Sequence, residues 1–162
     1  MIKSLKIISG GQTGVDRAAM DFALENNIPC SGWCPKGRRA EDGIIPLSYP
    51  LRETKESRYR ERTIKNVEES QGLLVFVDGK PDKGTVLAID QAEKRNIPTY
   101  IIYLTMNVED QETGILSLLE NSDISVINIV GPRESNNPGI YNKTKAFLEE
   151  LFPRLNVATS SK

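Results

Sequence analysis

The sequence contains no histidine, and this absence removes several kinds of active site at once. Without imidazole there is no Ser-His-Asp or Cys-His nucleophile pair and no histidine ligand for a metal. The two cysteines, Cys30 and Cys34, are too few for a disulfide framework, and a pair with three residues between them falls short of a zinc site when no further cysteine and no histidine is present. We therefore expect no metal site, and any catalysis must use carboxylates, lysine, tyrosine or a bound cofactor.

Long apolar runs and an excess of charge of one sign are also missing. The 21 basic and 22 acidic side chains leave a net charge of −1, which gives no general attraction to nucleic acid or to an anionic membrane. No apolar run approaches the roughly 18 residues that cross a bilayer, and the N-terminus lacks a signal-peptide pattern. We expect a cytoplasmic protein without nucleic-acid or membrane partners, in which any anion is recognised by a local site.

What the sequence does contain is an alternation of apolar, β-rich runs with helical patterns, at the spacing of βαβ units. The pattern predicts strands at 4–9, 28–33, 72–77, 98–104 and 124–131. It predicts helices at 13–26, 55–69, 84–95, 111–121 and 138–152, the last one capped by Asn137. The expected fold class is α/β, a three-layer Rossmann-like sandwich with a mainly parallel sheet of at least five strands. We expect a single ligand-binding domain over residues 1–156 and a frayed tail at 157–162.

The most informative segment is Ile7-Ile8-Ser9-Gly10-Gly11-Gln12-Thr13-Gly14-Val15, where an apolar strand enters a glycine-rich turn and then a helix. Glycine lets the backbone approach a ligand, while the free N–H groups and positive dipole end of the helix face that ligand. The motif Gly-Gly-Gln-Thr-Gly matches neither the dinucleotide-binding fingerprint nor the phosphate-binding P-loop. We expect an anion, in particular a phosphate, at the N–H groups of this turn. The alternative is a tight connection that binds nothing.

A second feature is the long interval from Cys34 to Thr54, which shows neither the helical nor the strand period. It carries Lys36, Arg38 and Arg39, followed by Glu41 and Asp42. We expect apolar side chains in and beside it to anchor it: Trp33, Ile44, Ile45, Leu47, Tyr49 and Leu51. A charge run is often only a solvated face. This run follows the second strand, however, at the edge of a parallel sheet where ligands bind.

If the basic run binds a ligand, its arginines should matter for affinity and not for folding. Arg38→Ala and Arg39→Ala are then each expected to weaken binding by about 1–3 kcal/mol. The free energy of unfolding should change by less than about 0.5 kcal/mol, because both residues lie in a loop.

Four segments are expected to meet at the carboxyl edge of the sheet, because parallel strands end on the same side. They are the glycine turn, the basic run, residues 78–85 and residues 131–139. Arg17 is a cation near the positive end of the first helix, which indicates a nearby anion or carboxylate as its partner. For Arg133 and Glu134, ligand contact and an ion pair between subunits are equally good interpretations.

Two further positions have a structural and a functional interpretation. Trp33 can stack on a flat ligand, although packing is the commoner use of one aromatic at the end of a core strand. Arg58, Arg60 and Arg62 have the spacing of an exposed helix face held by i,i+4 ion pairs, which makes them weak site candidates.

Five blocks of the sequence carry a family resemblance: residues 9–19, 32–43, 49–54, 62–67 and 131–135. They resemble the molybdenum-cofactor carrier proteins, which belong to the SLOG group of Rossmann-like proteins. The resemblance implies a homo-oligomer that binds and delivers the molybdenum cofactor, a pterin dithiolene with one terminal phosphate. It implies that the glycine turn holds the phosphate, that Lys36, Arg38 and Arg39 supply cationic contacts, and that Gly84 and Thr85 form a second phosphate-side loop.

The same group contains phosphoribohydrolases, so a nucleotide-processing enzyme or a nucleotide-sensing domain is the alternative. Those enzymes carry Pro-Gly-Gly-x-Gly-Thr-x-x-Glu, whereas this chain has Lys83 where glycine is common and Ala88 in place of the glutamate. This difference favours binding over catalysis, and no catalytic residue is assigned. The expected ligand contacts are Gly10, Gly11, Gln12, Thr13, Gly14, Arg17, Lys36, Arg38, Arg39, Gly84, Thr85 and Arg133. The candidate acids or polar contacts are Asp16, Glu41, Asp42 and Glu134.

Overall fold

A five-stranded, all-parallel sheet forms the centre of the protein in the computed structural model, which describes residues 4–155. The strands run in the order β2-β1-β9-β7-β8, so that the last strand of the chain lies in the middle of the sheet. Their bounds are β1 Lys6–Ile8, β2 Cys30–Ser31, β7 Gly72–Val77, β8 Thr99–Tyr103 and β9 Val126–Val130. All six residues of β7 are buried, as expected for a strand covered on both faces.

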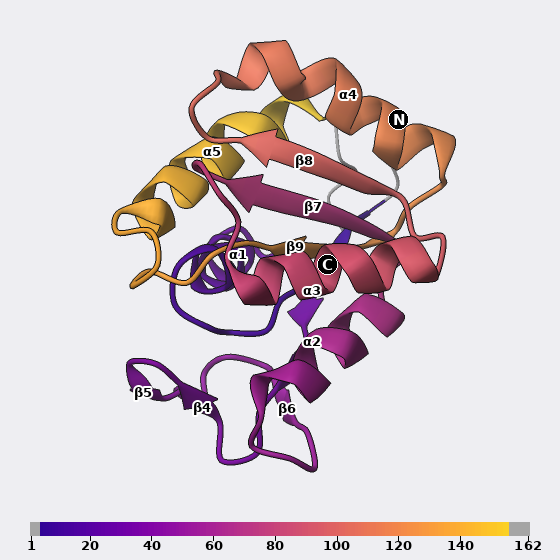
Figure 1. The fold of residues 1–162 in the computed structure, drawn as a ribbon. Coiled ribbons are helices and arrows are strands. Elements are labelled where there is room, and N and C mark those ends of the chain that lie inside the picture. Colours follow the sequence, from indigo (N-terminus) through magenta and orange to yellow (C-terminus); the bar gives the residue numbers. More distant parts are fainter. Residues whose placement is uncertain (1–3, 156–162) are drawn as a thin grey trace.

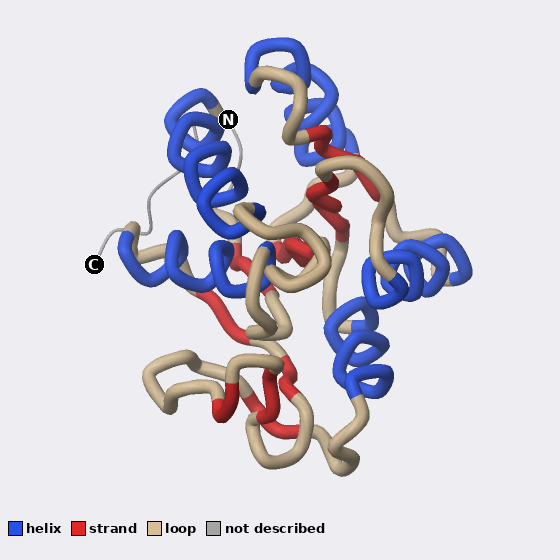
Figure 2. Tube along the Cα trace, turned by 60° about the vertical axis from the view of Figure 1, so that its left-hand side comes forward, coloured by secondary structure: helices blue, strands red, loops and turns tan. Residues whose placement is uncertain are grey.

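Helices cover both faces of this sheet. Their bounds are α1 Val15–Glu25, α2 Tyr59–Glu68, α3 Lys83–Lys94, α4 Val108–Asn121 and α5 Ile140–Arg154. Helix α5 packs against α1 and α4, whereas α2 packs against α3. Figure 1 shows α4 and α5 above β7 and β8, with α2 and α3 below them. The view in Figure 2 shows helices on both sides of the strands, which confirms the expected three-layer sandwich.

Several element boundaries differ from those expected. The strand expected at 28–33 is divided: β2 ends at Ser31, and β3 Trp33–Cys34 leaves the main sheet to pair with β6 Arg52–Glu53. The division falls at Gly32, where a Cβ atom would lie 1.9 Å from the carbonyl oxygen of Ser9. Only glycine allows that approach.

All five helices also begin at other residues than expected, and α5, α2 and α4 are examples. Helix α5 starts at Ile140 after Gly139, whose φ of 92° is left-handed, and Asn137 does not cap it. The Asn137 amide instead donates to the carbonyl of Asp78. Helix α2 starts at Tyr59 rather than 55, and α4 starts at Val108 because Asn107 caps it.

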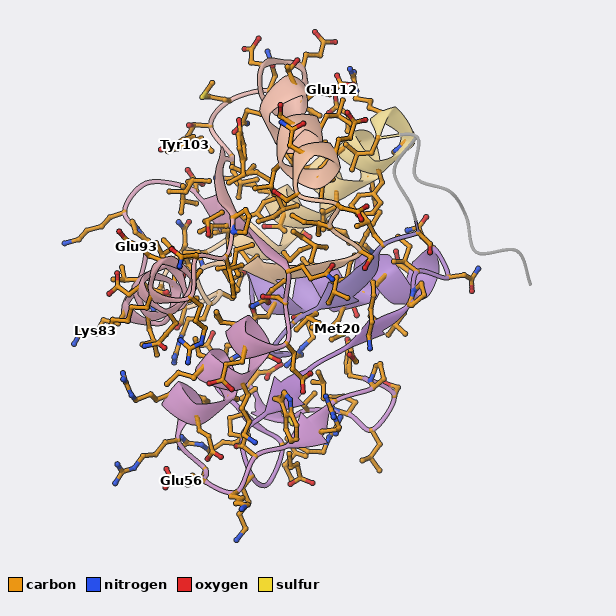
Figure 3. The ribbon with its side chains drawn as sticks, turned by 90° about the vertical axis from the view of Figure 1, so that its right-hand side faces the viewer. Met20, Glu56, Lys83, Glu93, Tyr103 and Glu112 are labelled. Carbon is orange, nitrogen blue, oxygen red and sulfur yellow. The ribbon has the colours of Figure 1, made fainter. Side chains whose placement is uncertain are left out.

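Residues 34–54, called the 34–54 segment below, form a small structure of their own beside the sheet, at the bottom of Figure 2. It contains β4 Arg39–Ala40 and β5 Gly43–Ile44, which pair antiparallel. Its buried side chains pack on Met20 of α1, which lies in the interior in Figure 3; they are Cys34, Ala40, Ile45 and Leu51. The expectation that Ile44 and Leu47 also anchor it is wrong, because they are 78% and 87% exposed.

The expected tail at 157–162 lies outside the described residues. Within residues 4–155, every helix falls short of the length and apolar character that crossing a membrane requires.

Candidate functional site

A small polar pocket opens at the carboxyl edge of the sheet, between the ends of β1, β9 and β7. The chain leaves β1 towards β2 on one side and leaves β7 towards β8 on the other, and ligands of open α/β sheets bind where connections diverge in this way. We call it the edge pocket; it is lined by Gly10, Gln12, Asp16, Arg62, Thr63, Asn66, Asp82, Gly84, Thr85, Ala88, Asn128, Val130, Gly131 and Arg133. Its volume of about 40 Å³ has room for a few water molecules or one compact polar group.

Three buried side chains of the edge pocket carry polar atoms without a hydrogen-bond partner. They are Nε2 of Gln12, Nε of Arg62 and both Nδ2 and Oδ1 of Asn128. These residues are only 5%, 9% and 0% exposed. Because an unsatisfied buried polar group costs about 1–3 kcal/mol, such groups are rare in native proteins. Three of them around one pocket indicate a site for a polar ligand.

A buried ion pair forms one wall of the edge pocket. Nη1 of Arg62 lies 2.9 Å from Oδ2 of Asp16. Burial raises the pKa of the Asp16 carboxyl, and the charge and hydrogen bond of Arg62 offset only part of that effect. Gly10 makes room for this pair, because a Cβ atom there would lie 1.8 Å from Nη1 of Arg62. The expectation that Arg62 belongs to an exposed helix face is therefore wrong.

The glycine turn has fewer free N–H groups than its sequence suggests. The N–H of Gly11 donates to Oγ of Ser9, that of Thr13 to Oε1 of Gln12, and that of Val15 to the carbonyl of Pro132. Gly14, with φ of 78°, packs so closely against the loop after β9 that a Cβ atom would lie 2.4 Å from the Pro132 carbonyl. An anion at this turn would have to replace contacts that the protein already makes.

Arg38 has a different surrounding from the one its sequence position suggests. It is buried, and its guanidinium donates to the carbonyls of Ile45 at 2.9 Å, Pro46 at 2.8 Å, Tyr49 at 2.9 Å and Leu51 at 3.0 Å. Each of these carbonyls belongs to the 34–54 segment. Arg38 thus holds this segment together, and the expectation that its loss leaves folding stability unchanged does not agree with the structure.

Three guanidinium groups surround the ring of Tyr59 near the edge pocket. The Cζ atoms of Arg39, Arg133 and Arg62 lie 4.5, 5.0 and 5.5 Å from its centroid. Arg39 is exposed and forms no ion pair within residues 4–155, and Arg133 is 4.0 Å from its only such partner, Glu41. Positive charge with little compensation therefore gathers around Tyr59, in a place where an anion would be stabilised.

The acidic candidates at this edge hold its loops together. Glu41 accepts hydrogen bonds from the Thr13 hydroxyl and from both N–H and O–H of Ser135. Burial alone would raise the pKa of Glu41, but the bonds from Ser135 and Thr13 outweigh it and keep the pKa below its usual value. Asp42 pairs with Arg17 at 3.0 Å. Of the two partners expected for Arg17, an anion or a carboxylate, the structure shows the carboxylate.

Glu134 caps a helix. Its carboxylate accepts from the N–H groups of Gly139 at 2.6 Å and Tyr141 at 3.0 Å, at the start of α5. This position agrees with the preference of carboxylates for helix N-termini. Both of its oxygens are thereby used within the chain.

The N-terminus of α3 forms the wall opposite the glycine turn. Asp82 caps it by accepting from the N–H of Thr85 at 3.0 Å, and its carboxylate also accepts from the Arg133 N–H and the Asn136 amide. A wider depression adjoins the edge pocket here, with a volume of about 490 Å³. This outer depression shares Asp82, Gly84 and Arg133 with the edge pocket and is otherwise lined by Lys80, Pro81, Lys83, Pro132 and Asn136. Lys83 extends outward at its rim (Figure 3).

The structure brings only part of the expected set together. Gly10, Gln12, Asp16, Gly84, Thr85 and Arg133 line the edge pocket. Gly11, Thr13, Gly14, Arg17, Lys36, Arg38, Arg39, Glu41, Asp42 and Glu134 are not among its lining residues. Lys36 is exposed and forms no ion pair with the rest of residues 4–155.

Trp33 is not in position to stack on a ligand of this pocket. Cations cover its ring, with Arg52 at 4.2 Å and Lys65 at 4.4 Å from the centroid, and its Nε1 donates to Glu69. The sequence patterns gave no indication of Thr63, Asn66 or Asn128 in this pocket, and of these three Asn128 is the one with unpartnered polar atoms. The one available signal was a polar residue inside the apolar run Val-Ile-Asn-Ile-Val.

Comparison with known proteins agrees with the resemblance seen in the sequence. Residues 7–152 match the circularly permutated YpsA SLOG family. Among curated proteins, none matches. A crystal structure at 1.45 Å of a protein from Syntrophus aciditrophicus SB, named a putative molybdenum carrier protein, is 44% identical. The match covers 94% of this chain and 98% of that protein's chain, and the TM-score is 0.89. The chain therefore belongs to the circularly permutated YpsA family of SLOG proteins.

Proposed function

We propose that this protein binds and carries the molybdenum cofactor, a phosphate-bearing pterin, at the carboxyl edge of its sheet. The observation that carries the proposal is the set of unpartnered polar atoms on Gln12, Arg62 and Asn128, all more than nine-tenths buried around one pocket. A ligand that pairs with these atoms recovers the free energy that their burial costs. The choice of ligand comes from the solved relative, which is named a putative molybdenum carrier protein.

The dimensions of the site suit a ligand with one compact polar end and a larger body. The edge pocket of about 40 Å³ admits the polar end, and the outer depression of about 490 Å³ is in the size range of small-molecule sites. We place the phosphate beside Arg133, Arg39 and the exposed Gly84 of α3. The glycine turn is a less favourable place, since the N–H groups of Gly11, Thr13 and Val15 already have acceptors. Lys36 belongs to the same basic run as Arg39, and we propose it as a further contact to the ligand outside the pocket.

Native mass spectrometry of protein purified from its own host tests this proposal. We expect a bound mass that matches a phosphate-bearing pterin, with or without molybdenum. Arg133→Ala should lower the occupied fraction, because it removes a guanidinium from the proposed phosphate site. Lys94→Ala is the matched control, since Lys94 lies in the last turn of α3. A bound molecule without phosphate, or equal occupancy in both variants, would contradict the proposal.

A nucleotide-processing enzyme or a nucleotide-sensing domain is the second candidate. The observation that favours an enzyme is Asp16, whose carboxyl lines the edge pocket and has a raised pKa because of its burial. A carboxyl that keeps its proton to higher pH can act as an acid. Against this, Ala88 lines the same pocket at the position where the phosphoribohydrolases have glutamate.

We further propose that residues 1–156 form one ligand-binding domain and that the protein is a cytoplasmic homo-oligomer without nucleic-acid partners. Light scattering coupled to gel filtration measures the assembly. A mass of 18.0 kDa, which is that of one chain, would contradict the oligomer.

A further inference from the structure

Asn128 occupies the centre of the sheet. It lies in the middle of β9, where it is paired in register with Ile8 of β1 and Leu73 of β7. It is 0% exposed, it lines the edge pocket, and neither its Nδ2 nor its Oδ1 has a partner. A leucine would fill a similar volume here without an unsatisfied amide, so the polar group costs stability in the empty protein.

The chemistry of an amide limits what can satisfy it. A carboxamide presents a donor and an acceptor side by side. A phosphate carries only acceptors, so it can pair with Nδ2 but leaves Oδ1 unsatisfied. A flat ring with a carbonyl oxygen next to a ring N–H pairs with both atoms, in the way that asparagine pairs with the edge of a nucleobase.

The other groups of the pocket fit the same ring edge. Nε2 of Gln12 is a further unused donor, and the Asp16 carboxylate is an acceptor for an amino group on the ring. The edge pocket is lined by two carboxylates, Asp16 and Asp82, and by two cations, Arg62 and Arg133, so that its charges balance. Arg39, which has no ion-pair partner within residues 4–155, adds positive charge outside the pocket, beside Tyr59. Charge therefore favours the heterocycle inside and the phosphate outside.

We propose that Asn128 selects ligands by pairing with an amide-type ring edge, a carbonyl next to a ring N–H, which enters the edge pocket while the phosphate stays near Arg39 and Arg133. The inference rests on the proposed function, since it assumes a phosphate-bearing ligand at this site. It adds that the ring end of the ligand enters the edge pocket, and that the ring edge is recognised by a residue of strand β9 and not by a loop.

Calorimetric titration with three probes tests the inference on the unmodified protein. Guanosine 5′-monophosphate has the ring edge and a phosphate, purine riboside 5′-monophosphate has the same ring size without carbonyl or ring N–H, and ribose 5-phosphate has no ring system. We expect the guanosine nucleotide to bind roughly 10–100-fold more tightly than the purine riboside nucleotide, as for a bidentate amide contact. Equal affinities would overturn the role of Asn128, and because this comparison needs no variant, it does not depend on how a mutant folds.

Asn128→Leu gives the second arm. We expect it to reduce the affinity for guanosine 5′-monophosphate to that for the purine riboside nucleotide, to leave ribose 5-phosphate unchanged, and to raise the melting temperature. A more stable variant that keeps the preference for guanosine 5′-monophosphate would show that water alone satisfies the amide, which overturns the inference.

Arg133→Ala separates the two proposals. It should lower the affinity for all three probes alike. If it lowers the affinity for none of them, the phosphate site of the proposed function is wrong, whatever the result for Asn128→Leu.

Discussion

Arg38 and Arg39 are adjacent in the sequence and have different surroundings in the structure. Arg38 is buried and donates to four carbonyl groups of its own segment, whereas Arg39 is exposed and lies over the ring of Tyr59. Both are arginines, and no feature of the local sequence separates them. Their roles differ because one backbone position faces the inside of the 34–54 segment and the next faces outward.

Arg38→Ala is expected to destabilise the protein. The substitution removes the charged donor from four carbonyls and leaves part of them buried without a partner, which should lower the free energy of unfolding by about 2–4 kcal/mol. Urea denaturation measures the change. Arg39→Ala is the matched control and should stay within about 0.5 kcal/mol of the unmodified protein, because its side chain is exposed. Equal stability of the two variants would contradict the role of Arg38.

The 34–54 segment is fastened to the sheet edge by carboxylates. Glu41 connects it to Thr13 and Ser135, and Asp42 connects it to Arg17. The hydroxyl of Tyr49 donates to Asp21 of α1 at 2.6 Å. The segment thereby keeps Arg39 next to Tyr59, although it contains only two-residue strands.

Acidification should loosen this attachment. The pKa values of Glu41 and Asp42 are lowered in the folded protein from ordinary values of 4.5 and 3.8. For Glu41 burial opposes the shift and bonds from Ser135 and Thr13 cause it; for Asp42 the bond from Arg17 causes it. A lowered pKa means that the folded state favours the charged form. The stabilisation is therefore complete above the ordinary values and is lost as the pH falls through the lowered ones.

Glu41→Gln measures the contribution of one carboxylate. At pH 7 we expect the variant to be about 1–2 kcal/mol less stable in urea, because an amide replaces an acceptor of charge-assisted bonds. This difference should shrink towards pH 3 as Glu41 of the unmodified protein takes up a proton. Trypsin should also cleave the variant faster at Lys36 and Arg39. Glu56→Gln is the control, since Glu56 is exposed at the outer end of the protein in Figure 3. A difference that is independent of pH would contradict the assignment.

The arrangement of the whole chain places the edge pocket where the two halves of the sheet diverge. Residues from the turn after β1, from α2, from the start of α3 and from β9 meet there. The pocket contains one carboxyl with a raised pKa, Asp16, and that carboxyl is already paired with Arg62. Ala88 lines the pocket at the position of the hydrolase glutamate. The site thus contains groups for binding and lacks a free acid at that position.

This arrangement predicts that the protein binds nucleoside 5′-monophosphates without hydrolysing them at an enzymatic rate. Loss of a general acid or base commonly costs on the order of 10²–10⁴ in rate. Incubation with AMP, GMP and CMP, followed by detection of free base and ribose 5-phosphate, measures the activity. Turnover of about 1 s⁻¹ or faster, within the ordinary range of enzymes, would contradict the carrier function and support the enzyme instead. If such turnover is lost in Asp16→Asn, the acid would be Asp16.

The sequence by itself determined the α/β sandwich and the edge at which its loops meet. Apolar runs such as Gly72–Val77, alternating with helical patterns, leave a parallel sheet as the arrangement that buries them, and parallel strands end on one side. Only the tertiary structure decided which side chains form the pocket. Arg62 meets Asp16 across 46 positions, and Asn128 becomes the floor of the pocket because β9 lies between β1 and β7. The N–H group of Val15 at the end of the glycine turn likewise found its acceptor on another loop, at the Pro132 carbonyl, and such a pairing has no local signature in the sequence.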